Sequence, residues 1–298
     1  MRVFVTGATG FVGTAVVREL VNAGYRVSGL ARSAAAAGML TAMGAEAHAG
    51  DLDDFESLRQ GIQRADAVIH TAFNHDFSQF RESCEADRSV IGLFGDELAG
   101  SDRPLIITSA IGVLPKGGTV TEETDPVEGS AANPRSASEE AARRIVDRGG
   151  LVSVIRLAPS VHGEGDHAFV PTLIRLARET GVSAYEGEGR NLWPTVHRLD
   201  AARLYRLALE KGFAGARYHA VAEDGVAFRD IATAIGDGLS IPVVSKTLEE
   251  AAAHFDWFSH FARMDVRASN VWTCAQLGWE PGQPDLISDL KLGHYFNL

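Results

Sequence analysis

Short apolar runs alternate with segments of helical period through the first half of the chain. The apolar runs lie at residues 2–7, 26–32, 46–52, 66–72, 104–110 and 151–157. Helical periodicity marks residues 11–24, 33–45, 53–65 and 138–149 between them. Strands that alternate with helices are typical of a parallel sheet with right-handed crossovers. The run "LIIT" is almost wholly apolar, as in a sheet covered on both faces, so the pattern predicts a doubly wound α/β fold.

The rhythm changes after about residue 160. A glycine-rich stretch at 162–171 is followed by a segment at 183–200 that we expect to be irregular. Helical patterns lie at 172–181, 199–212 and 228–239, and one more apolar run lies at 216–222. The second of these helices has one apolar face, formed by Ala201, Leu204, Tyr205 and Ala208.

This change predicts a core domain and a smaller C-terminal lobe. We expect residues 1–160 to form the core domain, with residues 190–222 returning to it. Residues 161–189 and 223–298 would then form the lobe that binds the substrate.

The composition excludes several classes of partner. The 298 residues carry a formal net charge of −11, whereas a nucleic-acid surface needs basic side chains that neutralise phosphates. Cys84 and Cys274 lie far apart and form no CxxC pair or metal-binding spacing, so we predict reduced thiols and no metal site. We expect neither a signal peptide nor a membrane span. These features predict a cytoplasmic protein whose partner is a small molecule.

The most specific motif, "VFVTGATGFVG", lies where the first apolar run meets the first helical pattern. Gly7 permits a tight turn, Gly10 lets backbone N–H groups approach a pyrophosphate, and Gly13 lets the helix pack closely on the strand. The free N–H groups and the positive dipole end of the helix also favour phosphates. The spacing is wider at its start than the common GxGxxG, but its position between strand and helix predicts a dinucleotide site in a Rossmann-type sheet.

The segment "TGATGFVG" is similar to the N-terminus of short-chain dehydrogenases/reductases, in their extended branch of NAD-dependent epimerase/dehydratase-like proteins. The segments "GDL", "DAVIHTAF", "LIITSA" and "WPTVHRLDAARLYRLAL" resemble the same family in the same order, so the resemblance covers most of the chain. It implies that Asp51 contacts adenine and that residues 71–73 line its ribose. The residues that we expect to bind the cofactor are Gly7, Ala8, Thr9, Gly10, Phe11, Val12, Gly13, Arg32, Ser33, Asp51, Leu52, Thr71, Ala72, Phe73, Ser109 and Pro159.

The end of the second strand indicates which nicotinamide cofactor is preferred. An NAD-selective site usually has Asp or Glu there, because a carboxylate accepts hydrogen bonds from the ribose hydroxyls. This chain has Ala31, Arg32 and Ser33 instead. A guanidinium matches a 2′-phosphate, so we predict NADP(H). The alternative is that Arg32 is only a solvated loop residue.

The resemblance fails at the catalytic pair. Working relatives have a Tyr-x-x-x-Lys pair, in which the tyrosine exchanges a proton with the substrate oxygen and the lysine holds the nicotinamide ribose. Alignment on Ser138 puts Arg135 at the tyrosine and Glu139 at the lysine. Ala110 falls at the usual hydroxyl position, with Ser109 one residue earlier. The inherited pair is therefore predicted to be absent.

Another group would then have to supply the proton. Our candidates for catalytic residues are Ser109, His162 and Tyr185, and His75 and His197 are further alternatives. His162 stands where relatives often carry tyrosine, and an ordinary histidine pKa suits proton transfer. For each of these side chains, a purely structural hydrogen bond or packing role is the competing interpretation.

These observations predict an NADP(H)-dependent oxidoreductase that acts on a small carbonyl, an alcohol or an activated double bond. The alternative is a non-catalytic protein that senses NADP(H), which the loss of both catalytic residues favours. An isomerase or lyase that uses the cofactor transiently ranks below reduction. Relatives pair through helices that we place near residues 79–99 and 135–148, so a homodimer is a further hypothesis.

Overall fold

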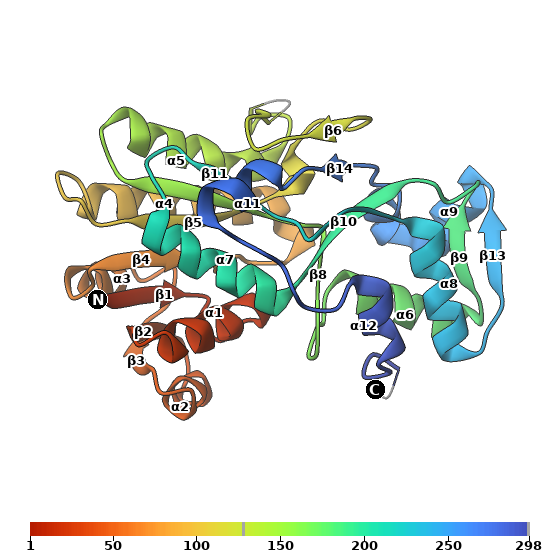
Figure 1. Cartoon of the computed structure of the whole chain (residues 1–298), viewed down its shortest axis with the longest axis horizontal. Helices are drawn as coiled ribbons and strands as arrows, with labels where there is room; N and C mark the ends of the chain where they lie inside the picture. The colour runs from red at the N-terminus through yellow and green to blue at the C-terminus, as the bar shows by residue number, and fades with distance from the viewer. Residues whose placement is uncertain (127–128, 297–298) are drawn as a thin grey trace.

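The computed structural model describes residues 1–126 and 129–296, and a parallel sheet of seven strands forms its centre. The strand order is β11-β7-β5-β4-β1-β2-β3 (Figure 1). These strands are β1 (Arg2–Thr6), β2 (Arg26–Ala31), β3 (Glu46–Ala49), β4 (Ala67–His70), β5 (Leu105–Ala110), β7 (Val152–Leu157) and β11 (Arg217–Ala220). The order reverses between β1 and β4, and ligands of such sheets bind outside the strand ends at that point. The predicted doubly wound fold is confirmed.

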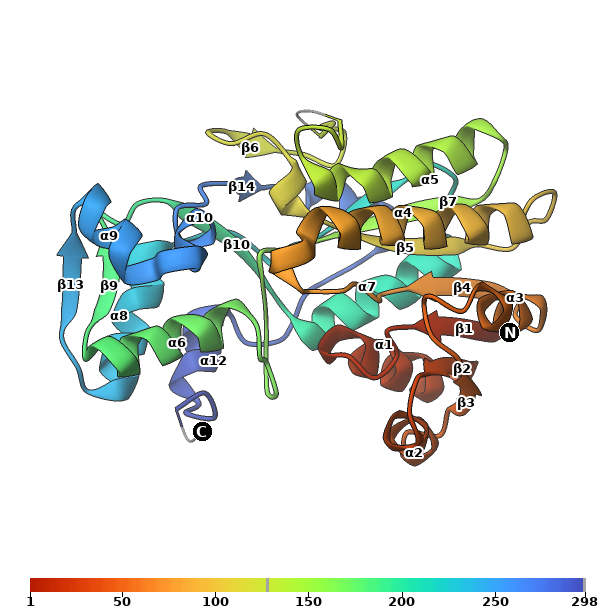
Figure 2. The same ribbon diagram turned by 180° about the vertical axis from the view of Figure 1, so that it is seen from behind.

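Helices cover both faces of this sheet (Figures 1 and 2). The helices are α1 (Phe11–Asn22), α2 (Ala34–Ala42), α3 (Phe55–Gln63), α4 (Phe80–Glu97), α5 (Ala137–Asp147) and α7 (Arg198–Lys211). Alternate residues of β1 serve the two faces: Val3 and Val5 join the core with α1, α2 and α7, whereas Phe4 joins the core with α3, α4 and α5. In the described part of the chain, no helix is both long and apolar enough to cross a membrane.

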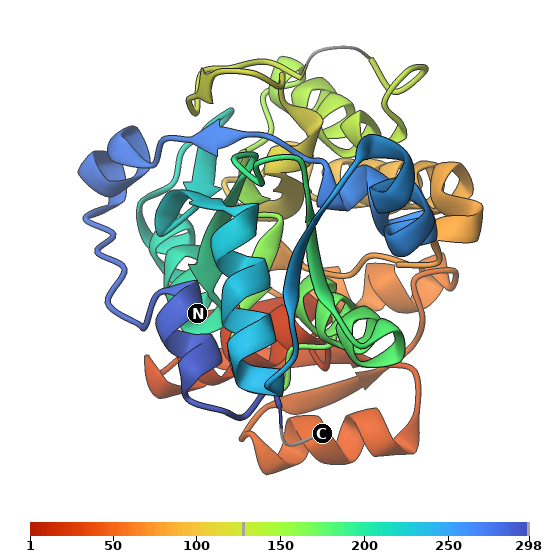
Figure 3. The same ribbon diagram turned by 90° about the vertical axis from the view of Figure 1, so that its right-hand side faces the viewer.

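A second lobe lies beyond the carboxyl ends of the central strands (Figures 1 and 3). It contains a three-stranded sheet and a parallel pair of strands. The strands are β8 (Ser160–His162), β10 (Leu192–His197), β12 (Glu223–Ala227), β9 (Ser183–Glu186) and β13 (Val243–Lys246). The helices are α6 (Phe169–Thr180), α8 (Phe228–Leu239), α9 (Leu248–Phe255), α10 (Ser259–Ala262) and α12 (Leu286–Lys291).

The expectation that residues 183–200 are irregular is wrong, because this segment contains β9, β10 and the first turn of α7. Glycines at 187 and 189 separate the two strands and both have positive φ, so they interrupt the pattern of alternation. Pro194 lies inside β10, where the register with β12 shifts between Trp193 and Thr195. A proline at an irregular point of a sheet masked the strand in the sequence.

Part of the tail returns to the central domain. The short strand β14 (Arg267–Ala268) pairs with β6 (Thr119–Val120), and α11 (Val271–Leu277) packs against α7 and β11. The remaining short elements are the 3₁₀ turns η1 (Phe77–Gln79), η2 (Ile111–Val113), η3 (Pro134–Ser136) and η4 (Asp256–Phe258). The tail therefore contacts both the central sheet and the lobe.

The lobe has an aromatic core, and this core generates a prediction about stability. Trp193 is fully buried and packs on Phe169, Phe228 and Phe258, whereas Trp257 is half exposed. Trp193→Ala should lower the free energy of unfolding by about 3–5 kcal/mol, because a large cavity replaces the ring. Trp257→Ala should cost about 1 kcal/mol or less. Chemical denaturation measures both, and equal losses would contradict the prediction.

Candidate functional site

The loop between β1 and α1 requires glycine at two positions. Gly7 has φ +67°, and a Cβ on it would lie 2.6 Å from the backbone nitrogen of Ala72. A Cβ on Gly13 would lie 1.9 Å from the carbonyl oxygen of Gly7. Both clashes are with backbone atoms, which cannot rotate away as a side chain can. The absence of side chains therefore lets β1, α1 and the loop after β4 approach one another closely.

The same loop offers donors to an anionic ligand. Gly10 caps α1 and donates its own N–H to the Gly7 carbonyl (2.9 Å), but it has no side chain that could bond the first-turn N–H groups. Those groups have no partner within a helix, and the helix dipole adds positive charge there. The α1 N-terminus also stands at the switch point of the sheet. These features fit the pyrophosphate of a dinucleotide.

The other predicted loop residues lie around this turn. Ala8 is buried against Gly29 of β2, whereas Thr9, Phe11 and Val12 are partly exposed. On the neighbouring loop, the Thr71 hydroxyl donates to the carbonyl of Thr6 (2.8 Å) and so ties the two strand ends together. Residues 71–73 are partly exposed, so they line the same strand ends.

Arg32 follows β2 and is exposed. No described residue forms an ion pair or hydrogen bond with its guanidinium, so its donors are available to a ligand. Ser33 caps α2, with its hydroxyl accepting from the N–H of Ala36 (3.2 Å). Asp51 is exposed after β3 and accepts from the N–H of Leu52 (2.6 Å). The structure thus leaves the end of β2 with a cation and no carboxylate at positions 31–33.

Arg135, at the position where the resemblance implies tyrosine, lies over the ends of β4 and β5. Its Nη1 donates to Asp87 of α4 (2.9 Å), and its Nη2 donates to the carbonyl of Thr108 (2.9 Å). The guanidinium carbon stands 4.3 Å from the centre of the Phe73 ring. A charged, planar group is therefore held in one orientation by an ion pair, a carbonyl and an aromatic face.

Asp87 connects Arg135 to the sheet interior. Its Oδ1 contacts Nε2 of His70 (2.8 Å), and Nδ1 of His70 contacts the Thr6 hydroxyl (2.6 Å). Ser138 also donates to Asp87. Burial opposes ionisation of Asp87, but Arg135 and the bonds from His70 and Ser138 hold its pKa below the usual value. An ionised carboxylate thus sits in a buried network that runs from β1 to α5.

Glu139, at the position where the resemblance implies lysine, points into the fold. Arg156 of β7 is fully buried and donates to both of its oxygens, Nε to Oε1 (2.8 Å) and Nη2 to Oε2 (2.7 Å). The Ser109 hydroxyl donates to the same Oε1 (2.7 Å). Ser109 is buried, and its proton is already directed at a carboxylate. It could not polarise a substrate oxygen without breaking this bond.

The other two predicted catalytic residues lie elsewhere. His162, on β8, is buried and its Nδ1 contacts Asp289 of α12 (2.8 Å). Its ring also meets His197 edge to face at 5.3 Å. Tyr185, on β9 in the outer part of the lobe, packs on Gly189. The described contacts join none of Ser109, His162 and Tyr185 to another, and Pro159 is half buried between β7 and β8.

Three side chains that were not assigned to the cofactor from the sequence gather around α1 and the strand ends. Arg198 stands 5.0 Å over the Phe11 ring, and His167 meets the same ring edge to face at 5.9 Å. Burial lowers the pKa of His75, and the charges of Arg135 and His167 lower it further. These residues are far apart along the chain. Two features of the sequence could have pointed to them: the glycine-rich run around His167, and Arg198, the basic residue after "TVH".

The loop with His167 also receives the C-terminal segment. The Tyr295 hydroxyl donates to Asp166 (3.1 Å) and accepts from the N–H of Gly163 (3.0 Å). Burial raises the pKa of Asp166 to about 6, although its bonds to Ala168 and Tyr295 oppose this. The segment after α12 is therefore attached to a loop next to the cofactor site.

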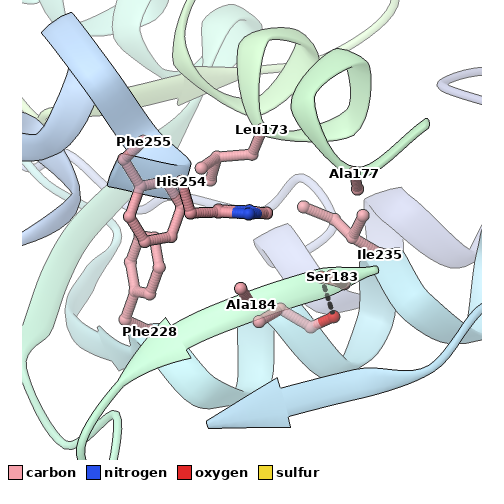
Figure 4. A pocket seen from close by; sticks show the side chains of 9 residues that line it. Leu173, Ala177, Ser183, Ala184, Phe228, Ile235, His254 and Phe255 are labelled. Carbon is pink, nitrogen blue, oxygen red and sulfur yellow. Dashed lines mark hydrogen bonds between the residues drawn. The ribbon is translucent and has the colours of Figure 1, made fainter. Parts of the chain in front are cut away.

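A small pocket in the lobe lies apart from these residues. Figure 4 shows it between α6, β9, α8 and α9, with the His254 ring reaching across it. Ser183 at its floor donates to the carbonyl of Ala232 (2.7 Å). Its cavity volume is about 10 Å³, which is room for about one water molecule. This pocket therefore offers no room for a dinucleotide.

The model of the NAD dependent epimerase/dehydratase family matches residues 3–222. The chain belongs to this family. Its members bind NAD(P), and a sterol dehydrogenase and a ketoreductase are among the homologues of this chain. The match covers α1 and all the strands of the central sheet. These elements form the site described above.

Three relatives show how far the similarity extends. An uncharacterized protein of Schizosaccharomyces pombe is 47% identical over 99% of this chain and 100% of its own length. The decarboxylating sterol-4-alpha-carboxylate 3-dehydrogenase of Dictyostelium discoideum is 28% identical over 78% of this chain and 74% of its own. A dTDP-glucose 4,6-dehydratase structure from Streptomyces venezuelae, with NAD and TYD bound, has a TM-score of 0.79 at 20% identity and covers 99% and 96% of the two chains. That last likeness supports the fold.

The glycine contacts generate a prediction about binding. Gly13→Ala should abolish dinucleotide binding and destabilise the fold, because its methyl group would overlap the Gly7 carbonyl. Gly38→Ala is the matched control, since Gly38 lies in α2 with no atom within 4 Å of its added methyl group. The control should raise stability by about 0.5–1 kcal/mol and leave binding unchanged. Thermal denaturation and titration with NAD⁺ and NADP⁺ test both. Normal binding by Gly13→Ala would contradict the site.

Asp166 generates a prediction about pH. A carboxyl group whose pKa is raised by folding binds its proton more tightly in the folded state, so its contribution to stability falls as the pH rises from about 4 to about 6. Relative to Asp166→Asn, the wild type should lose up to about 3 kcal/mol of unfolding free energy over this range. Chemical denaturation at several pH values measures the difference. A constant difference would show that Asp166 titrates normally.

Proposed function

We propose that the protein is an NADP(H)-dependent oxidoreductase that acts on a small carbonyl compound, an alcohol or an activated double bond. The observation that carries the proposal is the loop of Gly7, Gly10 and Gly13 at the open N-terminus of α1, in a chain with Arg32 at the end of β2. When bound, the nicotinamide supplies the hydride chemistry, and the protein supplies binding, orientation and charge.

The preference for NADP(H) rests on Arg32 and Ser33. A 2′-phosphate needs donors and would be repelled by a carboxylate, and the exposed Arg32 provides the charge. The first-turn donors of α1 and the guanidinium of Arg198 beside Phe11 would hold the pyrophosphate. Asp51 and residues 71–73 would line the adenosine.

The proposal still requires a group that exchanges a proton. Ser109, His162 and Tyr185 were the candidates from the sequence, but Ser109 donates to Glu139 and His162 is buried against Asp289. Among the histidines considered, His75 packs edge to face on Phe73 (5.2 Å between ring centres), and the same Phe73 ring contacts Arg135. We therefore favour His75 over the other three for this role.

A second function is favoured by one observation. Position 139 carries a carboxylate that is paired with Arg156, so it offers no cation to a nicotinamide ribose. A protein that binds NADP(H) without turnover, and reports its redox state, would tolerate this change.

We also propose that the protein forms a homodimer through the groove between α4 and α5, where Gly92, Ala141 and Ile145 lie among charged side chains.

Cofactor titration of the purified protein tests the proposal. NADPH, NADP⁺ and NADH should be compared by calorimetry and nicotinamide fluorescence. NADPH should bind clearly more tightly than NADH, and turnover with carbonyl compounds should follow. Tighter binding of NADP⁺ than of NADPH, without turnover, would favour the sensor. Absence of any nicotinamide binding would overturn both.

Arg32→Ala should weaken NADPH binding by about 10- to 100-fold, because one charge-assisted contact to the 2′-phosphate is lost. NADH binding should not change, since NADH has no 2′-phosphate. Arg26→Ala removes the same charge at the exposed start of the same strand and serves as the control. Unchanged NADPH affinity in Arg32→Ala would refute the cofactor preference.

A further inference from the structure

Arg135 lies where the loops of the cofactor site meet the start of α5. It donates to the carbonyl of Thr108, and the Thr108 hydroxyl donates to the carbonyl of His70 (2.7 Å). His70 ends β4, and the backbone that follows it at Ala72 lies directly against Gly7. A chain of contacts through Thr108, His70 and Ala72 therefore connects the guanidinium to the phosphate loop.

The guanidinium has donors that the protein does not use. Arginine carries five N–H groups. Two on Nη1 contact Asp87 and Ser138, and one on Nη2 contacts Thr108. Within the described residues, the N–H of Nε and the second N–H of Nη2 have no hydrogen-bond partner. Because Phe73 fixes the plane of the group, these two donors are held in place.

The surroundings of these donors favour a negative charge. The charge of Arg135 reaches His75, whose pKa it lowers in addition to the effect of burial. His167 acts on His75 in the same direction. Asp87 is the carboxylate paired with Arg135, and it lies on the side of α4 and not among the partly exposed residues 71–73. An anion at the strand ends would meet a preformed, desolvated cation.

We propose that Arg135 binds a carboxylate group of the substrate, beside the nicotinamide site. This inference rests on the proposed oxidoreductase function and narrows its substrates to small oxo acids or hydroxy acids. Two donors match the two oxygens of a carboxylate. Asp87 already offsets part of the charge of Arg135, so a monoanion fits this group better than a phosphate dianion does. Arg135 stands at the position where the resemblance implies a tyrosine, and on this proposal it recognises the charge of the substrate.

The test compares two probes that differ in one charge. Acetoacetate and its methyl ester should be titrated into the wild-type protein, with and without saturating NADP⁺, by calorimetry. Acetoacetate should bind, and the ester should bind at least about 10-fold more weakly, because it cannot accept from both donors as an anion. This comparison requires no substitution and is independent of folding defects.

Arg135→Lys keeps the charge opposite Asp87 but removes the planar set of donors. It should weaken acetoacetate binding by about 10-fold or more while the affinity for NADP⁺ stays unchanged. Arg143→Lys, at an exposed position of α5, is the matched control and should bind acetoacetate like the wild type.

Two results would overturn the inference: equal affinity for acetoacetate and its ester, or undiminished acetoacetate binding by Arg135→Lys. Lack of any acetoacetate binding would do the same. If the wild type bound acetoacetate but no nicotinamide, the proposed function would fail while the carboxylate site remained. The two failures are therefore distinguishable.

Discussion

A buried ion pair fixes the start of α5 against the sheet. Arg156 of β7 has no exposed surface and holds both oxygens of Glu139, which also accepts from Ser109. Loss of one partner would leave a buried charge uncompensated, at a cost of about 3–5 kcal/mol. Glu139 is therefore held inside the fold. Arg135, one turn earlier, then reaches over the strand ends toward Asp87, so the geometry of the site depends on this pair.

The consequence for chemistry is that the site supplies fixed charge where its relatives are expected to supply a titrating phenol. A guanidinium stays protonated in proteins and cannot pass its proton to a substrate. It can orient an anion and stabilise negative charge without reorganising, because its partners hold it before the ligand arrives. Asp87 contributes by position, since it holds the Arg135 guanidinium from the interior side. Under the proposed oxidoreductase function, proton exchange would therefore come from a separate group.

Local pattern was sufficient to predict the central sheet, but not the partners of the site residues. The apolar runs and the glycine spacing reflect constraints between neighbours along the chain, so β1, α1 and the parallel order followed from them. Ser109 was expected to face the substrate, because nothing nearby in the sequence indicates that Arg156 and Glu139 meet it from other elements. Pro194 and the glycines around it concealed β9 and β10 for a similar reason: a register shift is defined only by the partner strand.

The phosphate loop and the lobe are joined at one short segment. Asp166 accepts a hydrogen bond from Tyr295 in the tail, and the next residue, His167, packs on Phe11 at the first turn of α1. Arg198, at the start of α7, stands over the same Phe11 ring. The lobe cannot shift as a rigid body without disturbing these contacts. Under the proposed function, ligands at the lobe and at α1 would therefore act on shared residues, which would help to bring two ligands together at the strand ends.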